Sequence, residues 1–586
     1  MKVRFLRISN FRGFEQLELK PRDHVFVVGQ PGAGRSDLID ALWRALSPDS
    51  TRFPLFEDLD FYSRDLKKRI EIEVVLGDLG PRIEHAFLDR LEYWDLQEEK
   101  LLEEINNPND EDASAEIFLE RVVRLCYRAI WEDDQQQGQH WVDFPKFSDP
   151  DSEDFKRVSR ELRGELPVSL VNARGAALSL GTRSDLRQLV DADEQTDFST
   201  SLDQMMAGIE DLAGNLVQSK DLSDALDRIL EPLRIPLGVG NRAASQIIRF
   251  APEGGSLSGI LRSLQPTVKL REELGYLPLV RHGSTLAGLI RAARVLARPD
   301  AKGAVILVDD FGEDLDVDAA MHLAATLRHR AGQLWLSTRT GALGQCFRPE
   351  EMLRLAISSD GARTAHAGRS PMTKQERIAA RHVHLQILPA VSAKSVVIVE
   401  GPHDRAAIMA AAMKLHTEED VPLLAAQRIA ILDAGAADQS GGHSAIPRLA
   451  ELARGLGFHV IAVVDWDRDV AIAQQCLSEN LANAHVVIRW PQGHAIELAI
   501  LSSLADPLIR SAVQDVSQAL SATLTFDPSA IAGADLVKRT AKFLKSSAGL
   551  HAPFIEALPK GAHSALLRKC LDEIRTANAK SGHVQL

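Results

Sequence analysis

Acidic residues follow two apolar segments in the last third of the chain. Residues 396–404 read VVIVEGPHD and residues 463–469 read VVDWDRD, which places a glutamate and several aspartates just past two apolar runs. The acids are Glu400, Asp404, Asp465, Asp467 and Asp469. One such acid alone would suit the start of a helix, but carboxylates clustered at strand ends repel one another unless a cation lies among them. Hard divalent ions take oxygen ligands and assist phosphodiester displacement, so the segments predict a magnesium-dependent enzyme acting on nucleic acid.

A glycine-rich segment near the N-terminus has the pattern of a phosphate-binding loop. Residues 29–36 read GQPGAGRS between the apolar run 24–28 and a stretch with helical spacing. This matches G-x-x-x-x-G-K-[ST] except that Arg35 stands where lysine belongs. Backbone N–H groups around Gly29, Gly32 and Gly34 would surround phosphate oxygens, and Ser36 would hold magnesium. The segment predicts a site for ATP with Mg²⁺.

A second apolar strand ends in acids that suit the same nucleotide site. Ala304–Val308 is apolar and is followed by Asp309 and Asp310. Asp309 would be the magnesium carboxylate of the nucleotide site, and Asp310 would take the place of the acid that orients water.

Composition places the chain among ordinary proteins with several domains. It has 586 residues, 45% of them hydrophobic and 26% charged, and a net charge of -14. An acidic total is unusual for a DNA-binding protein, although it averages over domains and is compatible with a local basic groove. Four cysteines without C-x-x-C spacing, a charged N-terminus and the lack of an apolar run of about 18 residues predict a cytoplasmic protein with no membrane association.

The pattern of elements predicts an α/β fold with a discontinuous first domain. We expect an N-terminal hairpin, helical stretches near 87–105 and 115–130, and a further helical segment near 186–233. The last of these is either a helix pair packed on its own domain or a dimer-forming arm. The predicted domains are 1–81 with 250–375, a mainly helical insertion over 82–249, and a parallel α/β domain over 390–586.

The N-terminal part resembles the RecF/SMC branch of the ABC-type ATPases. The resemblance is carried by Asn10–Phe14, which reads NFRGF, by the glycine loop, and by Arg281–Thr285, which reads RHGST at the head of a predicted helix. It implies that Ser284 lies in a signature loop that reaches the nucleotide of a second protomer. A homodimer or higher homo-oligomer is therefore expected.

This chain departs from the family pattern at three positions that perform hydrolysis. Arg35 replaces the lysine, Asp310 is one methylene shorter than the expected glutamate, and Arg339 stands where the family has a histidine. A planar, forked guanidinium is no equivalent of a compact ammonium at a phosphate site. We expect ATP to be bound, weakly or without hydrolysis, with normal turnover as the alternative.

The pattern E-G-x-x-D followed by D-x-D-x-D resembles the Toprim fold of topoisomerases, primases and certain nucleases. An ABC-type ATPase with a helical insertion followed by Toprim resembles the OLD (overcoming lysogenization defect) nucleases, whose relatives include the nuclease subunit of the Gabija antiphage system. The resemblance implies two Mg²⁺ or Mn²⁺ ions held by Glu400, Asp404, Asp465 and Asp467, with Asp469 as an extra ligand. It also implies a later acid, for which Glu497 is the best match, and a catalytic lysine. Lys545 is our choice for that lysine, with His551 and Lys560 as rivals.

These observations predict a DNA endonuclease in which metal-activated water attacks a phosphodiester, with Glu400, Asp465, Asp467 and Lys545 as catalytic residues. A role in antiphage defence and a helicase-like partner would extend the resemblance. A topoisomerase is disfavoured because all four tyrosines precede the Toprim segment, and a primase because no zinc-binding cysteine pattern is present. The remaining alternative is a nucleotide-gated DNA-binding or sensor subunit that needs a partner for catalysis.

Overall fold

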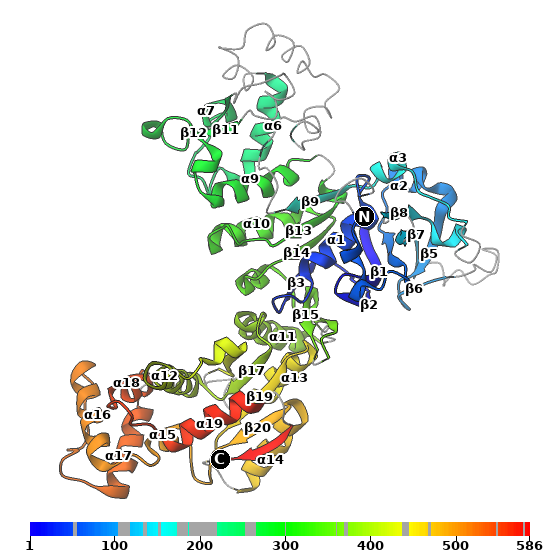
Figure 1. The fold of residues 1–586 in the computed structure, drawn as a ribbon. Helices are drawn as coiled ribbons and strands as arrows, with labels where there is room; N and C mark the ends of the chain where they lie inside the picture. Colours follow the sequence, from blue (N-terminus) through cyan, green and yellow to red (C-terminus); the bar gives the residue numbers. More distant parts are fainter. Residues whose placement is uncertain are drawn as a thin grey trace. The chain divides into compact units, whose positions relative to one another are not determined.

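The protein folds into two compact units of mixed α/β structure (Figure 1). The computed structural model describes residues 1–50, 56–102, 118–132, 137–149, 154–172, 178, 186, 219–251, 265–298, 301–358, 360–368, 373–435, 445–466, 470–546, 549–577 and 581–586. The N-terminal unit comprises 1–28 and 32–364, and the C-terminal unit comprises 29–31 and 365–586.

An antiparallel sheet opens the N-terminal unit. Its strands run in the order β2-β1-β4-β7-β5-β6, with β8 also paired to β7. They are β1 (Lys2–Phe11), β2 (Phe14–Leu19), β4 (Ile70–Gly77), β5 (Leu91–Asp95), β6 (Lys100–Leu101), β7 (Leu119–Glu132) and β8 (Gln137–Asp143). The predicted N-terminal hairpin is present as β1 and β2, whose pairing places Ile8 opposite Leu17. Two short helices, α2 (Pro81–Ala86) and α3 (Arg160–Gly164), belong to the same part of the chain.

The second sheet of this unit carries the glycine loop. Its strand order is β16-β15-β3-β14-β13-β9, and β3, β14, β13 and β9 pair in parallel. The strands are β3 (Val25–Gly29), β9 (Val168–Asn172), β13 (Val305–Asp309), β14 (Gln333–Ser337), β15 (Met352–Ile357) and β16 (Arg363–Ala367). The main helices are α1 (Arg35–Leu46), α9 (Ser284–Leu296) and α10 (Val317–Arg330). The apolar strands predicted at 24–28 and 304–308 are therefore formed.

The helices predicted at 87–105 and 115–130 are wrong, because strands β5, β6 and β7 occupy these stretches. In β7 the Val, Tyr and Ile side chains suit an extended backbone, and the strand pairs with β4, β5 and β8. Tertiary pairing thus outweighed a weak helical spacing. The prediction also had the chain return to its first domain at residue 250. In the structure, β9 (Val168–Asn172) already pairs with β13 in the sheet that carries the glycine loop. The division into three domains stays a prediction.

Most of the helical segment predicted over 186–233 lies outside the described residues. Its C-terminal end forms α6 (Lys220–Leu230). After it come α7 (Ala244–Ile247) and a small antiparallel sheet of β10 (Ile248–Ala251), β11 (Gln265–Val268) and β12 (Leu277–Pro278). The choice between a packed helix pair and a dimer-forming arm stays a prediction.

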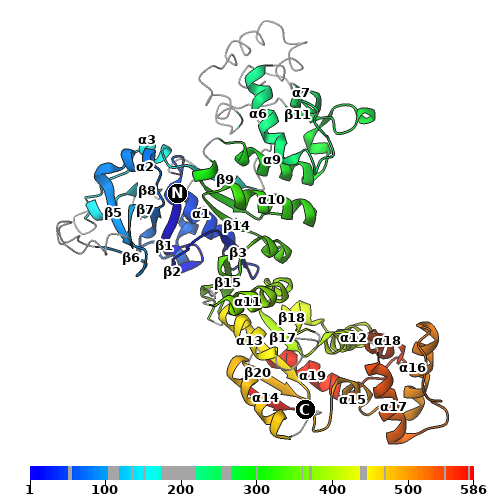
Figure 2. The ribbon, with the colours of Figure 1, turned by 180° about the vertical axis from the view of Figure 1, so that it is seen from behind.

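The C-terminal unit contains an entirely parallel five-stranded sheet in the order β18-β17-β19-β20-β21. The strands are β17 (Ser395–Val399), β18 (Ile429–Asp433), β19 (His459–Val464), β20 (Val486–Arg489) and β21 (Gly582–Gln585). The helices are α11 (Lys374–Ile387), α12 (Pro402–Glu419), α13 (Ile446–Gly455), α14 (Val470–Asn483), α15 (Ile496–Leu501), α16 (Asp506–Ala519), α17 (Gly533–Lys545), α18 (His551–Ala557) and α19 (Ala565–Thr576). Both views place α16 to α18 together, away from β20 and α14 (Figures 1 and 2).

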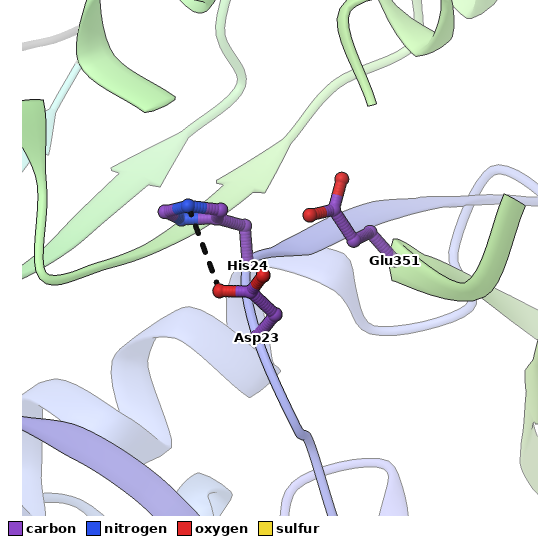
Figure 3. A group of neighbouring side chains, drawn as sticks. All are labelled: Asp23, His24 and Glu351. Atoms are coloured by element: carbon purple, nitrogen blue, oxygen red, sulfur yellow. Dashed lines mark ion pairs between the residues drawn. The ribbon is translucent and has the colours of Figure 1, made fainter. Parts of the chain in front are cut away.

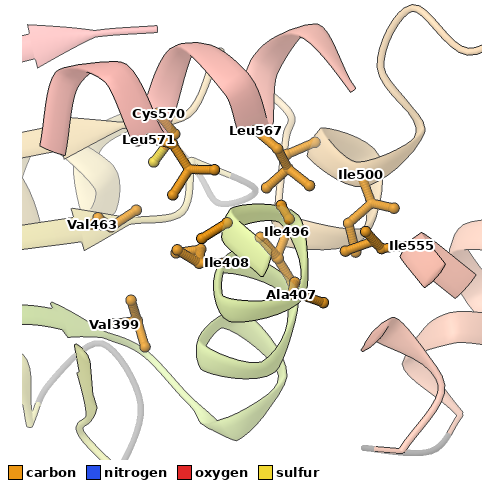
Figure 4. Close-up of a cluster of buried hydrophobic side chains, with 14 of the residues drawn as sticks. Val399, Ala407, Ile408, Val463, Ile496, Ile500, Ile555, Leu567, Cys570 and Leu571 are labelled. Atoms are coloured by element: carbon orange, nitrogen blue, oxygen red, sulfur yellow. The ribbon is translucent and has the colours of Figure 1, made fainter. Parts of the chain in front are cut away.

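One apolar core joins the sheet to the helices of this unit (Figure 4). Val399 and Val463, at the ends of β17 and β19, contribute to the same buried cluster as Ile408 of α12 and Leu571 of α19. Each large apolar side chain buried in this way contributes about 1.5–3 kcal/mol to folding. The core therefore holds the carboxyl ends of β17 and β19 and the start of α12 in fixed positions.

Candidate functional site

The predicted acids gather at the carboxyl edge of the C-terminal sheet. β17 and β19 are parallel neighbours, so Glu400 and Asp465, the next residue after each strand, leave the sheet at the same edge. Asp433, the last residue of β18, lies opposite Val399. We call Glu400, Asp404, Asp433 and Asp465 the acidic edge.

Glu400 and Asp465 are in direct contact within this edge. The backbone N–H of Asp465 points to Glu400 Oε1 at 3.4 Å. Residues separated in the sequence by α12, β18, α13 and β19 are thus adjacent in the fold. Asp467 and Asp469, the other two predicted ligands in this segment, lie outside the described residues.

Asp404 lies in the first turn of α12 and is buried. Its Oδ2 accepts a hydrogen bond from the backbone N–H of Gly401 at 3.1 Å, which caps the helix. Burial and the negative charge of Glu400 raise the pKa of Asp404 to about 7. A cation among these carboxylates would relieve the repulsion that this shift records.

A chain of three side chains runs behind the acidic edge. Glu497, in the first turn of α15, and His551, at the start of α18, are both buried, and Glu497 Oε1 lies 3.5 Å from His551 Nε2. His551 Nδ1 is in turn 3.2 Å from His403 Nδ1. Burial alone would raise the pKa of Glu497, but His551 and the charge of Lys545 bring it below its usual value. Burial and His551 lower the pKa of His403.

Lys545 is the last residue of α17, and its side chain is exposed. Helix α17 packs against α15, which carries Glu497, and the positive charge of Lys545 helps to lower the pKa of both Glu497 and His403. Of its two rivals, Lys560 is exposed after α18, whereas His551 is wholly buried.

The loop that carries Asp465 is tied to the turn before Glu497. The Trp466 N–H donates to His494 O at 3.0 Å, and Gly493 N–H donates to Trp466 O at 2.7 Å. The guanidinium of Arg489 stacks over the Trp466 ring at 3.8 Å. These contacts hold the segments of Asp465 and Glu497 in one arrangement.

Three residues of this region were not singled out from the sequence. His403 lies within the quoted motif, and its role became visible only through its contact with His551. Asp433 and its partner Arg405, whose Nη1 lies 3.2 Å from Asp433 Oδ2, also belong to the edge. Asp433 ends an apolar strand in the same way as the other acids, so the sequence pattern could have identified it.

A different group lies elsewhere in the N-terminal unit. Asp23, His24 and Glu351 are the described residues whose possible metal-ligand atoms all lie within 4.8 Å of one another (Figure 3). Glu351 accepts two hydrogen bonds from Arg328, at 2.7 and 3.1 Å. His24 Nδ1 accepts one from the backbone N–H of Leu334 at 3.0 Å. These atoms are engaged within the protein, so the group is a structural ion-pair network.

The glycine loop has the backbone of a phosphate-binding turn. Gly29, Gly32 and Gly34 have backbone φ angles of 147, 81 and 93°, which residues with a Cβ atom rarely adopt. Gly34 directly precedes α1, which begins at Arg35. The N–H groups at this helix start are thus positioned to meet an anion.

The three departures from the ATPase pattern meet in space. Asp310 lies between two guanidinium groups, with Oδ1 4.0 Å from Arg35 Nη2 and Oδ2 3.8 Å from Arg339 Nη2. Arg339 also pairs with Glu313 at 2.7 Å. The acid in the position expected to orient water is thus engaged by two cations. We call Arg35, Asp310 and Arg339 the ion triad.

Asp309 is placed beside the loop serine. It accepts a hydrogen bond from Ser337 Oγ at 2.7 Å and interacts with Ser36. Burial raises the pKa of Asp309 despite these hydrogen bonds. Ser284 begins α9 after Gly283, whose φ is 81°, and its side chain lies outside the described part of the structure.

Comparison with known proteins identifies the C-terminal unit. Residues 393–467 match the family model "Overcoming lysogenization defect protein-like, TOPRIM domain". The fold and this match define the chain as a mixed α/β protein with a Toprim domain. That domain is OLD-like, which confirms the Toprim domain predicted from the sequence, and it indicates a nucleic-acid-processing enzyme of nuclease type.

Structural comparison returns SMC head domains. The structure "Crystal structure of the SmcHead bound to the C-winged helix domain of ScpA" aligns at 12% identity and a TM-score of 0.34, covering 63% of this chain and 98% of that one. The SMC head domain from Thermotoga maritima aligns at 10% identity and a TM-score of 0.28, covering 63% of this chain and 100% of that one. Both TM-scores are below 0.5, so nothing about function follows from them. Comparison with curated proteins gives no match.

The described helices include none that is both long enough and apolar enough to cross a membrane.

Proposed function

We propose that the chain is a metal-dependent DNA endonuclease whose acidic edge cuts phosphodiester bonds, under the control of an N-terminal nucleotide-binding unit. The observation that supports it best is the contact of Glu400 with Asp465, together with the raised pKa of the neighbouring Asp404. The Glu400 carboxylate beside the Asp465 backbone, with the buried Asp404 carboxylate in the first turn of α12, would suit a hard divalent ion.

The donor set fits Mg²⁺ or Mn²⁺, because every candidate ligand is a carboxylate. Glu400, Asp404, Asp465 and Asp467 would hold two ions, with Asp469 and Glu497 as further ligands. When bound, such ions generate the attacking hydroxide and neutralise the leaving oxygen.

The side chains behind the edge orient the site. Glu497 Oε1 lies 3.5 Å from His551 Nε2, and a proton on that nitrogen would leave His551 Nδ1 free to accept from His403 Nδ1. In that tautomer His403 would keep Nε2 as an acceptor. Lys545 supplies positive charge at this place, which favours an incoming phosphate.

We infer that the nucleotide unit regulates cutting and turns over ATP slowly. Asp309 and Ser36 would hold the magnesium of bound ATP, and the glycine loop its phosphates. In the ion triad, Asp310 is engaged by Arg35 and Arg339, so the acid is poorly placed to orient water. A bound ATP phosphate would compete with Asp310 for the guanidinium of Arg35. The ion triad would then loosen, and this change would report that the nucleotide site is occupied.

The ion triad also favours a second function, a nucleotide-gated DNA-binding or sensor subunit whose partner cuts. In that case the purified chain binds DNA but leaves plasmid intact under every metal and nucleotide condition. The family resemblance adds three further proposals: a homodimer in which Ser284 reaches the partner's nucleotide, a helicase-like partner, and a cytoplasmic role in antiphage defence. Reduced phage plaque formation in cells that carry the gene with its neighbours tests the last of these.

The central test is supercoiled plasmid incubated with the purified chain in Mg²⁺, Mn²⁺ or Ca²⁺, with and without ATP. We expect nicked or linear product with Mg²⁺ or Mn²⁺, and none from Asp465→Ala/Asp467→Ala. The matched control, Asp515→Ala/Glu556→Ala, removes two exposed acids of the same unit and should cut like the parent. If the active-site variant cuts as fast as the control, the metal assignment fails.

A further inference from the structure

A row of lysines occupies one exposed stripe of α17. Lys538, Lys542 and Lys545 are spaced four and three residues apart, and all three side chains are exposed. A helix rises 1.5 Å per residue, so the row is about 10.5 Å long and lies along a single face. Among the described residues, none of the three lies within 4.0 Å of a carboxylate. We call these residues the lysine row.

The opposite face of the same helix is firmly packed. Leu536, Phe543 and Leu544 are buried in the core of the C-terminal unit, and Thr540 is also buried. This anchoring sets the rotation of α17, so the lysine row is held outward. Arg539, on a neighbouring stripe, is paired with Asp535 at 3.2 Å.

The row ends beside the helices that carry part of the candidate metal centre. Lys545 is the last residue of α17, which packs against α15, the helix of Glu497, and His551, six residues further on, contacts both Glu497 and His403. Lys542 and Lys538 continue the row one and two turns away from Lys545. In a chain with a net charge of -14, concentrated positive charge leading to a carboxylate site marks a path for a polyanion.

Building on the proposed nuclease function, we propose that the lysine row is the track on which the phosphate backbone of duplex DNA rests as it enters the acidic edge. Each DNA strand carries one phosphate per 3.4 Å of helix axis, so a row of about 10.5 Å spans roughly three successive phosphates. Such contacts position the duplex without reading its sequence. Lys538 and Lys542 would bind backbone, while Lys545 stays with the reacting phosphate.

The test is the salt dependence of DNA binding in metal-free buffer, where no cutting occurs. A labelled short duplex is titrated with wild type and with Lys538→Gln/Lys542→Gln at several KCl concentrations. Each lost phosphate contact lowers the slope of log K against log[salt] by about 0.9, so we expect a loss of about 1.8 in slope. Binding at low salt should weaken by roughly tenfold or more.

The matched control is Lys394→Gln/Lys569→Gln, which removes the same charge from exposed positions outside α17. For this control, the slope of log K against log[salt] should stay within about 0.5 of the wild-type slope. The thermal unfolding of both double variants should match that of the parent. Equal slopes for the two double variants would overturn the proposal that the lysine row binds DNA, while leaving the nuclease proposal intact. If wild type does not bind the duplex even at low salt, the nuclease proposal fails and the row fails with it.

Discussion

The two charged sites of this chain balance their charge in opposite ways. In the glycine-loop region, Asp310 lies between Arg35 and Arg339, so the protein supplies its own counterions. At the acidic edge, burial and Glu400 push the pKa of Asp404 upward, so negative charge accumulates there. The first arrangement suits a nucleotide site that binds and signals. The second calls for an external cation, as a catalytic metal centre does.

Removing charge from the acidic edge should have the largest effect. Glu400→Gln keeps the size of the side chain and an acceptor oxygen but loses the anion that faces Asp465. We expect DNA cleavage to fall by about 10³-fold, on the scale of the several kcal/mol that a bound metal supplies to a transition state. Cleavage rates and Mn²⁺ calorimetry measure the change. Glu479→Gln on α14 is the control, and equal losses in both variants would contradict the assignment.

The second prediction uses pH. The folded pKa of Asp404 is about 7 against an ordinary 3.8, so the folded protein holds this proton more tightly than the unfolded chain. Metal-free stability should therefore fall as pH rises from about 4 to 7, by up to about 4 kcal/mol, and stay low above 7. Asp404→Asn should be more stable than wild type at pH 8 in EDTA and equal to it at pH 4.

Denaturant unfolding at these two pH values checks the sign. Adding Mn²⁺ at pH 8 should stabilise wild type more than the asparagine variant, since the carboxylate is then a ligand. A variant that is less stable than wild type at pH 8 without metal would show that Asp404 is a structural cap.

The third prediction asks whether the ion triad limits hydrolysis. Combining Arg35→Lys, Asp310→Glu and Arg339→His restores the family pattern at all three positions. We expect steady-state ATPase activity to rise by about tenfold, because the acid is released from two guanidiniums and reaches further toward water. A wild-type ATP turnover of about 1 per second or more would contradict the prediction that the ion triad limits hydrolysis.

The smallest effect should come from Arg339→Ala alone. The Arg339 side chain is 62% exposed, so its ion pairs with Asp310 and Glu313 are screened by solvent. We expect the free energy of unfolding to change by less than about 0.5 kcal/mol. A thermal unfolding curve shifted by several degrees would contradict this. It would mean that the ion triad stabilises the fold and has no specific role at the nucleotide site.

Some elements followed directly from local pattern. The apolar strands at 24–28 and 304–308 were predicted within one residue of the observed β3 (Val25–Gly29) and β13 (Val305–Asp309). An unbroken apolar run of five residues suits a strand buried on both faces, as in a parallel sheet. By contrast, β7 was predicted as a helix, because its apolar residues satisfy either spacing until its neighbours β4 and β5 are known.

The sequence by itself determined which chemical groups are available: clustered carboxylates after apolar strands, a glycine loop before a helix, and the OLD-like Toprim pattern. Only the tertiary structure decided which of them meet. Asp310 contacts Arg35 from a distant part of the chain, and His551 contacts His403 across about a quarter of its length. Such contacts depend on how helices pack and loops turn, and hydrophobic periodicity reports only which face of each element is buried.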